Sequence, residues 1–168
     1  GKFGPKKDGI DDSWGGVTDI AFRAFQKDHG LRVDGWAGVE SLYELMWYYY
    51  PHFRKEEFKC KCGGKYCNGY PVKVDENLIV LLEAIRKEIG NKPINLNSGI
   101  RCNQHNKNVG GSPTSQHKLG KAADIRSSVG VTKVWQTANK LNTKGGVGRY
   151  KTFTHVDVRG RKTRFDYR

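Results

Sequence analysis

The spacing of apolar residues predicts two short helices in the first fifty residues of the chain. Apolar positions recur at helical spacing over 18–29, before Gly30, and again over 40–50, before Pro51. This spacing is typical of helices that bury one side, and glycine and proline commonly end such helices. The residues between them, 31–35, are typical of a turn.

Beyond this point the pattern predicts a mixture of helix and strand. The clearest helix spans 75–89 and carries leucine and isoleucine along one side. Segments 93–98, 122–125 and 154–158 have the composition and alternation of strands, and a further helix is expected around 133–141. Because these elements follow one another without regular strand–helix alternation, we expect an α+β domain.

The length of the chain, 168 residues, allows one small module beside one compact domain. No apolar run approaches the roughly 20 residues that a membrane-spanning helix needs, so no membrane insertion is expected. The segment from Gly1 to Gly9 is polar and glycine-rich, so we also expect no signal peptide in this chain.

The positive charge of the chain belongs to its second part. Residues 1–51 have a net charge of −2 and residues 52–168 a net charge of +15, which together give the +13 of the whole chain. Such a field attracts polyanions, whether nucleic acid, an anionic membrane or a bacterial wall. Because the basic residues are scattered, without a dense tract or an RNA-binding signature, nucleic-acid binding is not expected.

A motif in the first module resembles a known binding domain. The stretch from Phe25 to Gly38 contains FQ, a short spacer and then GL-x-VDG-x-x-G, a pattern that resembles the three-helix type of peptidoglycan-binding domain. The resemblance implies that residues 1–50 bind bacterial peptidoglycan, although the domain's first helix is not evident ahead of Asp8. The alternative is a generic pair of helices packed on Phe22, Phe25 and Trp36.

Three residues of the second part have the chemistry of a catalytic metal site. His117 lies seven residues before Asp124, which falls on a predicted strand, and Gly120 lets the backbone turn between them. His155 lies on a later strand, where its side chain shares a face with that of Asp157 because side chains alternate. Two imidazoles and a carboxylate with an open fourth position are what a catalytic zinc needs to bind and acidify water.

The neighbouring residues carry a resemblance to a known enzyme family. The motif S-x-H-x-x-G-x-A-x-D begins at Ser115, SG-x-R ends at Arg101, and a late segment surrounds His155. In this order the three motifs resemble the zinc D-Ala-D-Ala carboxypeptidase family, which shares its fold group with hedgehog signalling domains. The resemblance implies a catalytic domain at 53–168 with a short antiparallel sheet and flanking helices.

The same resemblance implies the roles of individual residues. One catalytic Zn²⁺ would be held by His117, Asp124 and His155. Arg101 would bind a carboxylate or carbonyl of the substrate, a task suited to its planar fork of donors, and Ser115 would contact the substrate.

The general base is not fixed by this resemblance. Many relatives place an acidic residue three positions before the last zinc histidine, or another histidine two positions before it. These positions hold Thr152 and Phe153 here. Asp157 is the nearest acidic candidate for the base, and a carboxylate beside a zinc ligand can equally orient a histidine, so both roles stay open.

The two resemblances imply one activity. We expect a monomeric zinc peptidase that hydrolyses peptide bonds of bacterial peptidoglycan, either as a D-Ala-D-Ala carboxypeptidase or as an endolysin-like endopeptidase of the stem or cross-link. The first module would tether it to this polymer. We expect it to act at the cell wall, after secretion or phage-mediated release. The alternative is a catalytically inactive peptidoglycan-binding protein with a structural zinc.

The four cysteines leave three possibilities open. Cys60, Cys62 and Cys67 lie in a loop rich in glycine and lysine, and Cys102 directly follows Arg101. They can form a closed structural zinc site, two disulfides or free thiols. In each case we expect the loop to brace the segment of Arg101. A nucleic-acid binder with a four-cysteine zinc knuckle would leave the histidine and aspartate set unexplained.

Overall fold

The computed structural model describes residues 13–168 and divides the chain into two compact units, Gly1–Tyr49 and Tyr50–Arg168. Residues 1–12 lie outside the described residues. The interpretation of the segment ahead of Asp8 and the expectation of no signal peptide concern these residues, so both stay predictions. None of the helices within residues 13–168 has the length and apolar character needed to cross a bilayer.

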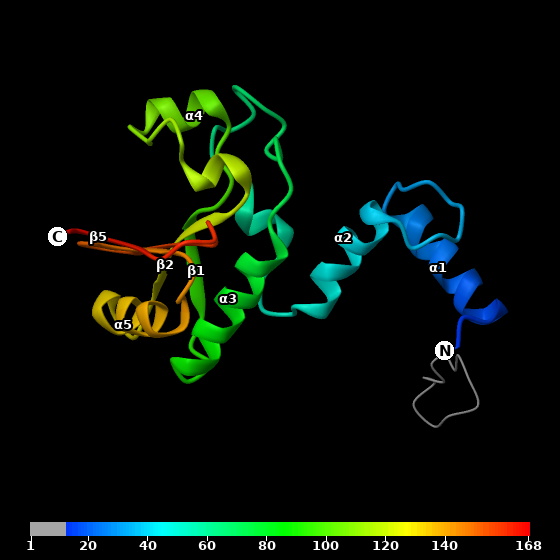
Figure 1. Ribbon diagram of the computed structural model, residues 1–168. Helices are drawn as coiled ribbons and strands as arrows, with labels where there is room; N and C mark the ends of the chain where they lie inside the picture. The colour runs from blue at the N-terminus through cyan, green and yellow to red at the C-terminus, as the bar shows by residue number, and fades with distance from the viewer. Residues whose placement is uncertain (1–12) are drawn as a thin grey trace. The chain divides into compact units, whose positions relative to one another are not determined.

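Residues 13–49 of the first unit contain two helices, α1 (Gly16–Asp28) and α2 (Val39–Tyr49), close to where the apolar spacing predicts them (Figure 1). The buried side chain of Gln26 holds the loop between them. Its Oε1 accepts hydrogen bonds from the backbone N–H groups of Asp34 (3.2 Å) and Gly35 (2.9 Å). Its Nε2 donates to Asp34 Oδ1 at 3.0 Å. The glutamine of the FQ motif and the aspartate of the VDG motif therefore belong to one hydrogen-bonded structure.

The apolar side chains of this unit are less buried than their helical spacing predicts. Phe22 and Met46 are buried, but Ile20 is 71% exposed and Trp36 is 76% exposed. The alternative of a helical pair packed on Trp36 is therefore wrong in that respect. The backbone explains the difference, because the Trp36 carbonyl accepts from Gln26 Nε2 at 3.1 Å while its indole stays outside.

The second unit is built on a five-stranded sheet with the order β1-β2-β4-β3-β5. The strands are β1 (Ile94–Ser98), β2 (Ala122–Ser127), β3 (Gly146–Tyr150), β4 (Thr154–Asp157) and β5 (Thr163–Tyr167). Three of them, β1, β2 and β4, lie where the sequence pattern predicts strands. The other two were not predicted.

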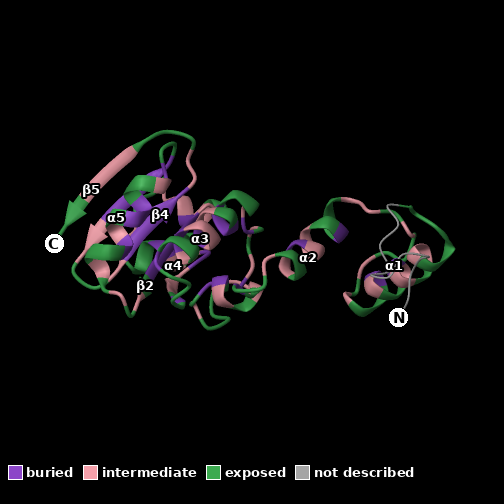
Figure 2. Ribbon diagram, turned by 90° about the horizontal axis from the view of Figure 1, so that it is seen from below, coloured by how far each residue is buried: buried purple, intermediate pink, exposed green. Residues whose placement is uncertain are grey.

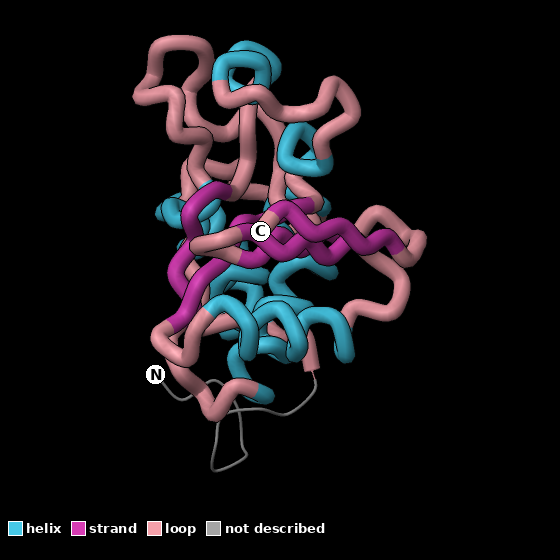
Figure 3. Tube along the Cα trace, turned by 90° about the vertical axis from the view of Figure 1, so that its left-hand side faces the viewer, coloured by secondary structure: helices cyan, strands magenta, loops and turns pink. Residues whose placement is uncertain are grey.

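Helices lie on both sides of this sheet, which confirms the α+β prediction. The two long helices, α3 (Glu76–Glu88) and α5 (Val131–Leu141), pack on each other, and α5 contacts β2, β3 and β4 (Figure 1). The opposite side is built mostly from loops with α4 (Asn103–Asn108) and the short helix η2 (Gln116–Leu119) (Figure 3). A further short helix, η1 (Lys55–Phe58), contacts β1.

The sheet is not wholly antiparallel, and the prediction of an antiparallel sheet is wrong for β5. The pairings of β1 with β2, β2 with β4 and β3 with β4 are antiparallel, whereas β5 runs parallel to β3. The chain reverses after β4, but β2 and β3 already occupy both sides of that strand. The returning strand therefore pairs with the free edge of β3, which points in the same direction.

The core of this unit lies between the sheet and the long helices. Strand β4 is buried along its whole length, whereas β5 is only partly buried (Figure 2). Leu78, Leu82 and Ile85 of α3 are fully buried, as the predicted apolar side of this helix requires. The buried central strands β2 and β4 form a rigid support for the polar residues that they carry.

Candidate metal centre and active site

Three elements bring the predicted metal ligands together. Asp124 on β2 lies opposite His155 on β4 in the antiparallel register, and His117 comes from η2. The chain turns from η2 into β2 at Gly120, whose φ of +69° favours glycine. A Cβ at this position would also overlap the carbonyl oxygen of Lys73. All three side chains are buried.

The distances between the three side chains fit one zinc ion. His117 Nε2 lies 3.3 Å from Asp124 Oδ1 and 3.3 Å from His155 Nδ1, and His155 Nδ1 lies 2.9 Å from Asp124 Oδ1. Tetrahedral coordination at about 2.0–2.1 Å from zinc separates neighbouring donor atoms by about 3.3 Å. Two imidazole nitrogens and one carboxylate oxygen are also a donor set that zinc accepts in catalytic sites.

The second nitrogen of each histidine has its own partner. His117 Nδ1 lies 2.6 Å from the carbonyl oxygen of Gly99, so this nitrogen is the one that donates. His155 Nε2 lies 3.0 Å from Asp157 Oδ2. Such contacts fix the tautomer and orientation of a metal-binding imidazole. They leave His117 Nε2 and His155 Nδ1 directed at Asp124.

The electrostatics of the cluster favour an ionised carboxylate. Burial opposes ionisation of Asp124, but its polar contacts with the rings of His117 and His155 outweigh it and hold the pKa of Asp124 well below its usual value. Burial lowers the pKa of His117, which favours its neutral form. Burial acts in the same direction on His155, but hydrogen bonds to Asp124 and Asp157 raise the pKa of His155 overall.

Asp157 lies behind His155, away from the cavity. Its side chain is fully buried, and its Oδ1 accepts from the Gly146 N–H at 3.0 Å and from Arg159 Nε at 2.7 Å. Its Oδ2 accepts from Arg159 Nη2 at 2.6 Å and contacts His155. Asp157 is also absent from the residues that line the cavity at the metal site. This arrangement favours an orienting role over the role of general base.

A cavity of about 820 Å³ opens at the metal site and is lined by the three predicted ligands. Arg101 and Ser115 line it too, so every predicted site residue except Asp157 lines the cavity, and Asp157 reaches the site through its contact with His155. Arg101 Nε donates to Ser98 Oγ at 2.8 Å, and Arg101 Nη2 contacts Asp124 Oδ2. Among the described residues, Asp124 is the only one with a carboxylate that lines this cavity.

Comparison with known proteins places the chain in a family. A protein-family model described as Peptidase M15 matches residues 51–157. The chain belongs to the peptidase M15 family. A curated protein of Streptomyces albus G, named zinc D-Ala-D-Ala carboxypeptidase, is 31% identical to it over 132 residues. These cover 69% of this chain and 49% of that protein, so the chain spans about half the length of this relative.

The family membership confirms the family that the motifs predict, and the name of the relative supports zinc as the metal. Neither match shows a peptidoglycan-binding domain, and the family model covers only residues 51–157.

In this M15 family member, the sequence pattern missed an aromatic wall of the cavity. The rings of Tyr150 and Phe153 stack with centroids 4.3 Å apart, and Tyr167 lies 5.2 Å from Tyr150. Phe165, which also lines the cavity, lies 5.5 Å from the ring of His155. Alternation along 163–167 places Phe165 and Tyr167 on one face of a strand, and this signal could have found them.

Proposed function

We propose that this chain is a zinc-dependent peptidase that hydrolyses peptide bonds of bacterial peptidoglycan. The observation that carries the proposal is the buried set of His117, Asp124 and His155, whose donor atoms have the spacing of a tetrahedral zinc site at the floor of a cavity. Membership of the peptidase M15 family supports peptide hydrolysis, and the name of the relative supports a D-Ala-D-Ala terminus as substrate.

The residues of the chain would divide the work as follows. His117 Nε2, His155 Nδ1 and Asp124 Oδ1 would hold the zinc ion. When bound, zinc in such a site polarises a carbonyl group and lowers the pKa of water towards about 7. The carbonyl of Gly99 and the carboxylate of Asp157 fix the two rings so that the required nitrogens face Asp124.

Arg101 would bind the substrate beside this centre. Its guanidinium lines the cavity and is tied to Ser98 and Asp124 by Nε and Nη2. Within residues 13–168 Nη1 makes no hydrogen bond, so this nitrogen is available for a substrate carboxylate or carbonyl. Ser115 lines the same cavity and would add a hydroxyl. The aromatic side chains of Tyr150, Phe153 and Phe165 line the same cavity and would offer apolar contact to the substrate.

Replacing this guanidinium tests the role of Arg101. We expect Arg101→Lys to lower kcat/KM by about 10²-fold, because one ammonium nitrogen cannot replace three spaced guanidinium nitrogens that contact Ser98, Asp124 and a substrate oxygen. Zinc content should change little. Steady-state kinetics on a D-Ala-D-Ala peptide measure the effect, and Arg126→Lys is the matched control because Arg126 is an exposed residue of the same sheet. Equal kinetics for both variants would contradict the assignment.

We also propose that the first unit binds peptidoglycan. The proposal is supported by the FQ and VDG motifs, which form one hydrogen-bonded structure around Gln26. Large apolar side chains stay exposed in this unit, among them Trp36 at 76% and Ile20 at 71%. Aromatic rings of this kind can pack against the apolar faces of sugars.

A single substitution tests this binding role. Trp36→Ala in the full chain should weaken binding to purified walls by about tenfold, the loss expected when about 1.4 kcal/mol of ring contact is removed. Hydrolysis of a soluble peptide should stay unchanged. Val80→Ala is the control, because Val80 is 46% exposed in the second unit. Co-sedimentation measures binding, and unaltered binding by Trp36→Ala would exclude this surface.

The bond that is cut can be identified from the products. Incubation with purified peptidoglycan should release either free D-Ala or new amino termini, and a chelator should stop the release. Free D-Ala identifies a carboxypeptidase, whereas new amino termini without D-Ala identify an endopeptidase of endolysin type. We propose that either form acts as a monomer at the cell wall, after secretion or phage-mediated release.

One observation favours a catalytically inactive peptidoglycan-binding protein as the second candidate. Thr152 and Phe153 occupy the positions of the proton-handling residue, and within residues 13–168 the cavity is lined by no carboxylate besides that of Asp124. Wall binding without any released product, even in protein loaded with zinc, would support this second candidate.

A further inference from the structure

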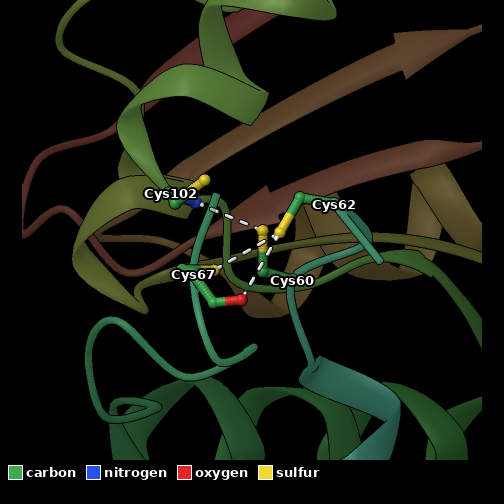
Figure 4. Close-up of side chains that lie close together, drawn as sticks. All are labelled: Cys60, Cys62, Cys67 and Cys102. Carbon is green, nitrogen blue, oxygen red and sulfur yellow. Dashed lines mark hydrogen bonds between the residues drawn. The ribbon is translucent and has the colours of Figure 1, made fainter. Parts of the chain in front are cut away.

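The four cysteines form a second cluster, separate from the candidate active site. Cys60, Cys62 and Cys67 come from the loop after η1, and Cys102 comes from the start of α4 (Figure 4). Every pair of the four sulfur atoms lies within 4.8 Å. Cys60 and Cys102 are buried.

We propose that these four cysteines bind a second metal ion, a structural zinc with four thiolate ligands. Tetrahedral coordination with Zn–S distances of about 2.3 Å separates the sulfurs by about 3.8 Å. The Sγ atoms of Cys62 and Cys67 lie 3.5 Å apart. Two disulfides would need the sulfurs to approach only in pairs, whereas here each sulfur lies within 4.8 Å of the other three.

Backbone amides around the sulfurs also match a thiolate cluster. The N–H of Cys102 donates to Cys60 Sγ, the N–H of Gly69 donates to Cys67 Sγ, and the N–H of His105 donates to Cys102 Sγ, each at 3.4 Å. Such donors compensate the negative charge of metal-bound sulfur. Three of the four sulfurs are therefore supported from the backbone.

The loop needs a cross-link of this kind. Residues 59–75 contain no helix or strand, and a segment of that length without secondary structure is uncommon in a compact domain. The Cys60 N–H donates to the Gly69 carbonyl at 2.8 Å and closes the base of the loop. A structural zinc contributes folding free energy directly to segments that bury little apolar surface.

The second zinc would also position Arg101. The segment from Ser98 to Cys102 lies between η1 and η2, because Ile100 N–H donates to the Phe58 carbonyl at 2.8 Å and Arg101 N–H donates to the His117 carbonyl at 3.1 Å. Phe58 lies two residues before Cys60, and Arg101 lies directly before Cys102. A metal ion bound by Cys60 and Cys102 would therefore hold together the two segments that contain Phe58 and Arg101.

Metal analysis and thiol counting on the purified full chain test the site. We expect two zinc ions per chain, one after Cys67→Ser, one after His117→Ala and none when both changes are combined. The cobalt-substituted protein should show sulfur-to-cobalt charge-transfer absorption, which His117→Ala keeps and Cys67→Ser loses. Mass spectrometry should find all four cysteines reduced.

Several results would overturn the proposal. The first is a mass of the wild-type chain that is lower by two hydrogens for each disulfide. The second is a cobalt-substituted wild-type protein without the charge-transfer band. The third is a wild-type zinc content of one ion per chain that His117→Ala reduces to none. Because the first two are measured on the wild-type chain, a Cys67→Ser variant that fails to fold leaves the test intact.

The positioning role rests on the proposed peptidase function and has its own readout. Cys67→Ser should raise KM for a D-Ala-D-Ala peptide by about tenfold with kcat nearly unchanged, because Arg101 is displaced while the catalytic zinc stays. An unchanged KM after loss of the second zinc would overturn the positioning role. Wild-type protein that binds two zinc ions without hydrolysing any peptide would instead overturn the proposed function.

Discussion

Replacing His117 by alanine is expected to remove the zinc ion of the histidine and aspartate site and to abolish peptide hydrolysis. His117 Nε2 is one of three donor atoms that lie about one tetrahedral edge apart, so its loss leaves Asp124 and His155 as an incomplete site. We expect kcat/KM to fall by about 10³-fold or more, which corresponds to about 4 kcal/mol of transition-state stabilisation. Metal analysis and kinetics on the same preparation measure both effects.

The control for this variant is another histidine of the same unit. His52 Nδ1 lies 2.7 Å from Glu83 Oε2, and its side chain is 44% exposed and absent from the cavity lining. We expect His52→Ala to keep its zinc and its activity. Hydrolysis by His117→Ala at the wild-type rate would show that this site is not the catalytic centre.

Asp157→Asn is expected to weaken both the metal site and the fold. Its carboxylate is fully buried between His155 and Arg159, and breaking a buried ion pair from one side costs about 3 kcal/mol of unfolding free energy. Burial opposes ionisation of Asp157, but hydrogen bonds with His155 and Arg159 outweigh it and hold the pKa of Asp157 below its usual value, so the carboxylate is charged. Loss of the partner of His155 should reduce zinc affinity by about 10–100-fold.

The two roles open to Asp157 predict different kinetics. If Asp157 orients His155, saturating zinc should restore most of kcat in Asp157→Asn. If it were the general base, kcat would stay abolished at full zinc occupancy. Asp166→Asn is the matched control, because Asp166 pairs with Arg168 on the surface and such exposed pairs contribute at most about 1 kcal/mol. Denaturant unfolding and zinc competition titrations measure the two effects.

The predicted elements and the missed ones differ in where their stability originates. Helix α3 and strand β2 were predictable because their own residues bury apolar side chains, as Leu78, Leu82 and Ile125 do. Strands β3 and β5 lack such a pattern. A Cβ at Gly148 would overlap the ring of Phe165, so the pairing of β3 with β5 needs a glycine at this position. Glycine is uncommon inside strands, and the sequence pattern therefore argues against a strand here. Contacts distant in sequence therefore decide these strands.

The candidate site shows the same division. Spacing within one motif was enough to predict that His117 and Asp124 bind the same metal ion, and strand alternation placed Asp157 on the same face as His155. Only the folded chain shows that Arg159 and the Gly146 N–H occupy the oxygens of Asp157 and that its carboxylate faces away from the cavity. The direction of a side chain depends on neighbours that local spacing does not encode.

The most direct test of the account is a zinc titration of metal-free protein while release from purified peptidoglycan is followed. The account predicts no release without metal and a rate that rises in step with zinc occupancy of the site formed by His117, Asp124 and His155. Release at the full rate with that site empty, or no release at full occupancy on walls from several sources, would contradict it.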